Sequence, residues 1–95
     1  MIVSVAILTA KRGHEGQVVD VLNDYVTKEK NLQGCIRVYY KRAINNDDTF
    51  MVYSEYDNKE HFEAAQKAAH HQDKDKGVEN VLHPHIVKGF YGNFD

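Results

Sequence analysis

The sequence predicts an α+β protein whose strands and helices follow the order β-α-β-β-α-β. Two observations predict this order. Short runs of β-branched and aromatic residues alternate with two segments whose apolar residues recur at helical spacing. Glycines and polar clusters stand between these segments, where turns are expected. The chain has 95 residues, a size that suits one domain over residues 1–95.

The first strand is expected over residues 2–10, a short and almost continuous apolar run. Apolar residues occupy both alternating faces of this run, which is typical of a strand buried on both sides. Residues 15–31 then change to a helical period, with Leu22 and Tyr25 in the apolar stripe. Gly34 follows at the position where glycine commonly ends a helix.

Two further strands, over residues 35–43 and 50–56, are predicted to form a hairpin around the polar turn cluster at residues 45–48. One register of this hairpin places Arg37 directly opposite Glu55. A slip of one residue would lose this charge pair, so the match favours that register.

The second helix is expected to begin near Asp57, which precedes Glu60 by three residues in the pattern of a capping box. The polar stretch at residues 72–76 is expected to break or bend this helix, and another helical turn should follow from Val78. The last strand is expected over residues 85–91. The complete order is that of the ferredoxin-like fold, an antiparallel four-stranded sheet with both helices on one face.

The face of the sheet away from the helices is expected to be unusually apolar. Alternation along the strands places six side chains there: Val3, Val5, Ile7, Tyr39, Met51 and Tyr53. An apolar patch of this kind marks an interaction surface. Because the same face of a second copy would cover it, the sequence predicts a homodimer that forms a dimeric α+β barrel.

Composition excludes several classes of protein. A net charge of −2 lacks the basic footprint of a nucleic-acid-binding protein. The first apolar run is too short to span a membrane and has no basic segment before it, so no membrane segment or signal peptide is expected. Cys35 is the only cysteine, which excludes a disulfide within the chain and favours a reducing, cytoplasmic location.

The six histidines do not form a recognisable metal site. His83 and His85 would share one face of a strand, but the sequence has no cysteine pair and no His-Glu-x-x-His segment. We therefore expect no bound metal.

A ligand pocket is expected between the helices and the sheet face that they cover. Alternation and helical spacing turn one group of side chains towards it: Leu22, Tyr25, Ile36, Val38, Tyr40, Phe50, Val52, Ser54, Tyr56, Phe62 and Ala65. Core packing is the alternative for each of them, since aromatic and alanine stripes commonly fill cores.

Four segments carry a resemblance to a known family. The first strand ends in Lys-Arg-Gly at residues 11–13, and residues 33–37 read Gln-Gly-Cys-Ile-Arg. Residues 53–60 read Tyr-Ser-Glu-Tyr-Asp-Asn-Lys-Glu, and residues 68–70 read Ala-Ala-His. In this order, the segments resemble the antibiotic biosynthesis monooxygenase family of small dimeric proteins, which includes quinol monooxygenases. The resemblance implies a monooxygenase that oxidises a small quinol-like or polyphenolic aromatic with O2 and uses no cofactor.

The resemblance also implies two catalytic residues. His70 is expected to accept the proton of the substrate, because histidine titrates near neutrality. A solvated helix end is the alternative for His70. Tyr56 stands where the family has a tryptophan and is expected to donate a hydrogen bond to a substrate oxygen.

Two other functions stay open. Tyr56 and Ala65 replace the usual tryptophan and a common histidine, which favours a non-catalytic stress-response module that binds an aromatic or haem. Residues 56–62 also resemble proteins of this fold that isomerise small phosphorylated signalling molecules. That reaction needs a cationic pocket, whereas Arg37 and Lys41 are expected on the opposite face of the sheet.

Overall fold

The structure is a computed structural model that describes residues 1–75, 78–84 and 86–92, without the side chains at positions 69–75 and 79. Its elements are β1 (Ile2–Thr9), α1 (Glu15–Glu29), β2 (Cys35–Arg42), β3 (Thr49–Tyr56), α2 (Lys59–Asp75), the short 3-10 helix η1 (Val78–Asn80) and β4 (Val87–Gly92). This order confirms the ferredoxin-like α+β fold that the sequence predicts. No helix among the described residues is long and apolar enough to cross a membrane.

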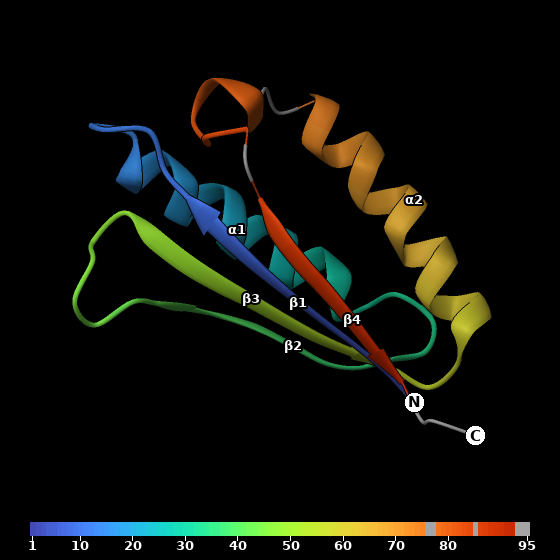
Figure 1. Cartoon of the computed structure of the whole chain (residues 1–95). Coiled ribbons are helices and arrows are strands. Elements are labelled where there is room, and N and C mark those ends of the chain that lie inside the picture. Colours follow the sequence, from blue (N-terminus) through green and yellow to red (C-terminus); the bar gives the residue numbers. More distant parts are fainter. Residues whose placement is uncertain (76–77, 85, 93–95) are drawn as a thin grey trace.

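The four strands form one antiparallel sheet in the order β2-β3-β1-β4. Figure 1 shows both helices on the same side of this sheet. β1 therefore lies inside the sheet between β3 and β4, and the helices leave the opposite face of the sheet uncovered within one chain.

The hairpin of β2 and β3 has the predicted register, with Arg37 opposite Glu55. The register shifts between Cys35 and Arg37, so that Cys35 pairs with Tyr56 and one extra residue, Ile36, bulges out of β2. Ile36 is 55% exposed. The expectation that Ile36 faces the helices is therefore wrong, because the bulge breaks the alternation of side chains at that point.

The start of α2 differs from the predicted capping box. The side-chain oxygen of Asn58 accepts a hydrogen bond of 2.9 Å from the backbone N–H of His61, so Asn58 caps the helix. Asp57 instead accepts a hydrogen bond of 2.7 Å from the ring Nδ1 of His61. Gly34 packs against this pair and has a φ of +85°, a backbone conformation that favours glycine.

Most other element boundaries lie one or two residues from the predicted ones, and two differences concern the end of α2 and the start of the last strand. α2 stays helical through Asp75, so the expected break at residues 72–76 is wrong for residues 72–75. The last strand begins at Val87, two residues later than expected. Both differences lie at element ends, where sequence patterns are least informative.

The core lies between the sheet and the helices. Its buried apolar members are Leu8, Ala10, Val18, Leu22, Phe50, Val52 and Leu82. Burying a side chain of the size of Leu or Phe contributes about 1.5–3 kcal/mol, so these contacts hold α1 and the segment after η1 against the sheet.

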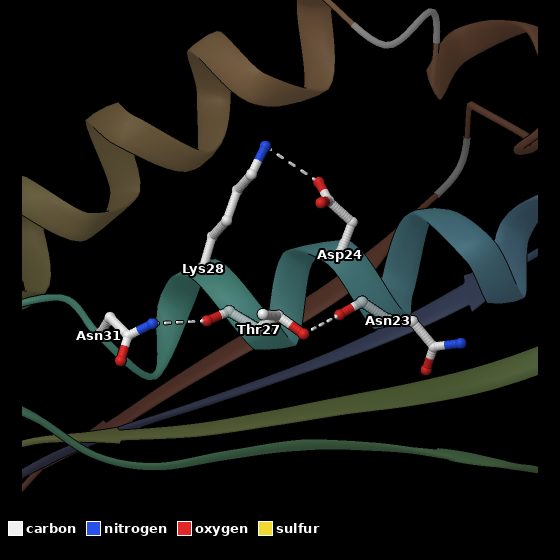
Figure 2. A network of polar contacts seen from close by, with 5 residues as sticks. All are labelled: Asn23, Asp24, Thr27, Lys28 and Asn31. Carbon is white, nitrogen blue, oxygen red and sulfur yellow. Dashed lines mark hydrogen bonds and ion pairs between the residues drawn. The ribbon is translucent and has the colours of Figure 1, made fainter.

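Polar contacts along α1 follow the helical repeat (Figure 2). Lys28 Nζ lies 3.1 Å from the carboxylate of Asp24. The hydroxyl of Thr27 donates a bond of 2.8 Å to the carbonyl of Asn23, and the amide of Asn31 donates one of 3.1 Å to the carbonyl of Thr27. All three contacts join residues four positions apart, about one helical turn, along α1 and just past its C-terminal end.

Candidate functional site

A cavity of about 170 Å³ lies between the sheet and the helices. Its walls come from β1, α1, β3, α2, η1, β4 and the segment between η1 and β4. The lining residues are Ser4, Ala6, Leu8, Val21, Leu22, Tyr25, Val52, Ser54, Gln66, Val78, Leu82, Ile86 and Lys88. An apolar cavity of roughly 150 Å³ is large enough to hold benzene. The cavity therefore has room for a ligand built on one aromatic ring.

The strand β1 provides the floor of the cavity. Ala6 lies opposite Val52 of β3 on one side and opposite Lys88 of β4 on the other. Ser4 lies opposite Ser54. The space above this part of the sheet stays open because the side chains of Ser4 and Ala6 are small.

Four polar side chains interrupt an otherwise mainly apolar lining: Ser4, Ser54, Gln66 and Lys88. Ser54 is only 4% exposed and still reaches the cavity. Lys88 lines the cavity and is exposed to solvent. Among the described residues that line the cavity, Lys88 is the only one with a formal charge. A few polar groups in an apolar cavity are typical of a small-molecule site.

Four residues predicted for the pocket line this cavity, namely Leu22, Tyr25, Val52 and Ser54. The other predicted residues do not line it: Val38, Tyr40, Phe50, Phe62 and Ala65. Phe50 is fully buried, and Ala65 is 3% exposed. Both therefore pack in the core, which is the alternative that the sequence left open.

Tyr40 has a structural contact of its own. Its hydroxyl donates a hydrogen bond of 2.7 Å to the side-chain oxygen of Asn23 on α1. This bond joins β2 to α1 at the edge of the sheet. The ring of Tyr40 also contacts the ring of Phe50, with centroids 6.5 Å apart.

Tyr56 lies in a buried cluster outside the cavity lining. It is 1% exposed, and its hydroxyl donates a hydrogen bond to the carboxylate of Glu29, which is 4% exposed. Its ring meets Phe62 edge-on at 5.7 Å, and Phe62 meets Phe90 at 5.3 Å. The hydroxyl of Tyr56 is therefore hydrogen-bonded to Glu29, the last residue of α1, rather than directed into the cavity.

The proposed base, His70, belongs to α2, but its side chain lies outside the described residues. The backbone places position 70 four residues after Gln66, which lines the cavity. Four residues are about one helical turn, so position 70 follows Gln66 along the same side of the helix.

The described histidines and Cys35 do not line the cavity. His83 is exposed, and His85 lies outside the described residues. No group of three or more His, Cys, Asp or Glu side chains that could hold a metal occurs among the residues described. Burial raises the pKa of the Cys35 thiol, and the negative charge of Glu29 raises it further. Cys35 is therefore a protonated thiol at neutral pH.

Sequence reasoning missed Lys88, Gln66 and Glu29. Lys88 follows from alternation along the last strand, because its neighbours at positions 86 and 90 are apolar and face the helices. Gln66 and Glu29 carried no such signal, since polar residues on helices are usually solvated. Sequence analysis placed no cation on the helix-covered face of the sheet, but Lys88 lies there and lines the cavity. Arg37 and Lys41 lie on the other face, as expected.

Comparison with known proteins adds a family and a set of similar folds. The family model of the antibiotic biosynthesis monooxygenases matches residues 1–74. A solved structure from Nitrosomonas europaea, assigned to the same kind of protein, has a TM-score of 0.87 and 16% identity and covers 100% of both chains. A protein of that description from Deinococcus radiodurans has a TM-score of 0.85 and 14% identity, covering 100% of this chain and 94% of its own.

A third solved structure is a variant of SnoaB, a cofactor-independent oxygenase from Streptomyces nogalater. Its TM-score is 0.81 at 12% identity, and the match covers 99% of this chain and 93% of that one. None of the curated proteins compared with the chain matches it. At these identities, the three solved structures show a shared fold.

Proposed function

The chain belongs to the antibiotic biosynthesis monooxygenase family, and we propose that it is a cofactor-independent monooxygenase that oxidises a small quinol-like aromatic with O2. The observation that supports this function is the cavity under the helices, with room for one aromatic ring and a mainly apolar lining. In such a cavity, an aromatic anion meets O2 away from bulk water, so reactive oxygen species stay contained.

The proposed reaction needs no metal or flavin because the substrate itself supplies the electrons. In net terms, a quinol and O2 give a hydroxyquinone and water. One oxygen atom of O2 becomes bonded to a ring carbon, and the other leaves as water with two hydrogens of the quinol. The quinol gives up four electrons, which O2 accepts. The protein has to hold the ring and accept the proton that makes it electron-rich.

We assign these tasks to residues of the cavity and its surroundings. Leu22 and Val52 would hold the ring, and Ser54 would bind an oxygen of the substrate. His70 is the proposed base, because position 70 follows Gln66 by one helical turn. Tyr56 is proposed to act as a positioning residue, since its hydroxyl is engaged by Glu29.

Oxygen consumption in the presence of reduced single-ring quinones tests the proposal directly. We expect consumption that depends on the protein, and a product that carries one atom of labelled O2. His70→Ala should slow it strongly, whereas His83→Ala, at an exposed position outside the cavity lining, should not. Equal rates for His70→Ala and the unmodified protein would show that His70 is not the base. If no oxygen is consumed, the protein is not an oxygenase for these substrates.

A non-catalytic aromatic-binding module is the second candidate. The buried Tyr56–Glu29 bond favours it, because this bond takes the hydroxyl that would otherwise contact a substrate. Binding of a single-ring aromatic without oxygen consumption would support this candidate over the enzyme.

We also propose that the protein is a cytoplasmic homodimer that associates through the uncovered face of the sheet. Ile7, Val87 and Tyr91 are 37%, 57% and 60% exposed on single chains. Pairing of Ile7 with Val87, and of Val3 with Tyr91, places these side chains on the face opposite the cavity. A second copy would remove this apolar surface from water.

A further inference from the structure

The geometry points to a specific ligand chemistry for the cavity: a single-ring aromatic whose oxygen is ionised, as a phenolate, and is held by Lys88. We propose Lys88 as the residue that selects this ligand. The inference deepens the proposed function and rests on it, since it names the ionic form of the substrate that the oxygenase would use.

The first support for this assignment is the position of Lys88 on the sheet. Lys88 lies directly opposite Ala6, the small residue on the cavity floor, and it lines the cavity itself. On the other side of Ala6, Val52 and the neighbouring Ser54 line the cavity from β3. A ring resting on Ala6 would therefore have an ammonium group at one edge and a hydroxyl towards the other.

The dimensions suit one ring between these two groups. β3 and β4 flank β1 at about 4.8 Å each, so their backbones lie about 10 Å apart. The side chains of Lys88 and Ser54 rise from these two strands on the helix-covered face of the sheet. This span and the cavity volume of about 170 Å³ fit a monocyclic ligand rather than several fused rings.

The second support is the charge of the cavity. Among the described lining residues, no carboxylate accompanies Lys88, and no ion pair of Lys88 occurs between the described residues. The two buried glutamates among the described residues have other partners: Glu29 accepts from Tyr56, and Glu55 accepts from Tyr53. A cation beside a mainly apolar cavity favours the ionised form of a phenol over its neutral form.

The third support is Ser54, which is 4% exposed and lines the cavity. Its hydroxyl makes no side-chain hydrogen bond among the described residues, and the same holds for Ser4, its partner across the strands. A hydroxyl that lines a cavity and makes no side-chain hydrogen bond among the described residues is suited to bind a ligand oxygen. A quinol, which carries a second oxygen on the same ring, would use both Lys88 and this pair of serines.

A phosphorylated ligand fits the same cavity less well. Phosphate recognition usually uses several cationic or backbone donors, whereas the described lining provides one lysine among mostly apolar groups. Inorganic phosphate is therefore included in the test as the competing chemistry.

The test measures binding rather than turnover. The dissociation constants of 4-nitrophenolate and of its neutral methyl ether, 4-nitroanisole, are compared by calorimetry at a pH where the phenol is ionised. We expect the phenolate to bind about tenfold more tightly or better, the effect of one charge-assisted hydrogen bond. Lys88→Met should remove this preference, and Lys88→Arg should keep it. Ser54→Ala should weaken both ligands' binding less than Lys88→Met weakens the phenolate.

The matched control is Lys41→Met, which removes an exposed lysine on the other face of the sheet. It should leave the preference unchanged. The inference is overturned if the unmodified protein binds both ligands equally or neither of them, if folded Lys88→Met keeps the preference, or if inorganic phosphate displaces the phenolate at equal concentration. Phenolate selection without oxygen consumption would sustain the inference while removing the oxygenase. Oxygen consumption that Lys88→Met leaves unchanged would support the oxygenase and overturn the role proposed for Lys88.

Discussion

Arg37 lies directly opposite Glu55 across β2 and β3, with its guanidinium Nη1 3.9 Å from the Glu55 carboxylate. The same carboxylate accepts a hydrogen bond of 2.6 Å from the hydroxyl of Tyr53. Tyr53 in turn stacks on Tyr39, with ring centroids 4.9 Å apart. These contacts lie on the uncovered face of the sheet, so this face combines apolar side chains with an ordered polar group.

A charge placed on this face should disrupt the proposed dimer. Ile7→Lys would put an ammonium group among apolar side chains, which is costly in a buried interface. We expect sedimentation at micromolar concentration to give one folded chain of 10.9 kDa for this variant, and twice that mass for the unmodified protein. Ile44→Lys is the control, because Ile44 is fully exposed in the hairpin turn. A monomeric unmodified protein would contradict the dimer.

Tyr56→Phe should destabilise the fold. The substitution removes the hydroxyl that donates to the buried carboxylate of Glu29, and loss of a partner for a buried charged group costs about 1–3 kcal/mol. Urea unfolding measures this change in the free energy of unfolding. Tyr40→Phe, which loses a bond to Asn23 near the surface, should cost less. Equal costs would show that the Tyr56–Glu29 bond has no special weight.

Gly34→Ala should be more destabilising than Gly13→Ala. Both glycines have nearly the same backbone conformation, with φ of +85° and +86°, so the strain of an L-residue is shared. At Gly34 the added Cβ would also overlap Asp57 and His61, whereas at Gly13 it meets nothing within 4 Å. The difference in unfolding free energy between the two variants therefore measures the contact of Gly34 with the start of α2. Identical losses would mean that α2 moves away without cost.

The Asp57–His61 pair should make stability depend on pH on the acid side. The hydrogen bond from His61 holds the pKa of Asp57 below its ordinary value. A carboxylate with a lowered pKa in the folded state stabilises the fold above its unfolded pKa, and this stability is lost as the pH falls through the folded pKa. Asp57→Asn should therefore flatten the acid limb of a plot of unfolding free energy against pH. An unchanged acid limb would show that the pair contributes nothing.

Filling the cavity should abolish ligand binding. Ala6→Phe places a ring on the floor of the cavity of about 170 Å³, where a ligand ring would otherwise lie. Because the new side chain enters empty space, its overpacking cost should stay at or below about 1–3 kcal/mol. Ala64→Phe, at an exposed position of α2, serves as the control and should bind 4-nitrophenolate like the unmodified protein. Unimpaired binding by Ala6→Phe would place the ligand elsewhere.

Much of the fold could be predicted because its signals are periodic. Short runs of β-branched and aromatic residues predicted the strands, and the Arg37–Glu55 charge pair predicted the hairpin register that the structure has. The bulge at Ile36 could not be predicted, since one inserted residue leaves the flanking pattern intact.

The site was less predictable than the fold. Alternation shows which side chains face the helices, but it does not show whether a side chain lines a cavity or fills the core. Phe50 and Ser54 share one face of β3, yet Phe50 is buried in the core and Ser54 reaches the cavity. Tyr56 was expected at a substrate, but a carboxylate contributed by α1 from 27 residues away engages its hydroxyl, and long-range pairs of this kind leave no local pattern.

The alternation of β1 has a consequence for how such a protein can diverge. Ser4, Ala6 and Leu8 belong to the cavity, while Val3, Val5 and Ile7 belong to the opposite surface. Substitutions at neighbouring positions of β1 therefore affect different properties. One changes the shape of the cavity, and the next changes the uncovered surface of the sheet. Ligand specificity and subunit contacts can therefore change independently through substitutions along one strand of eight residues.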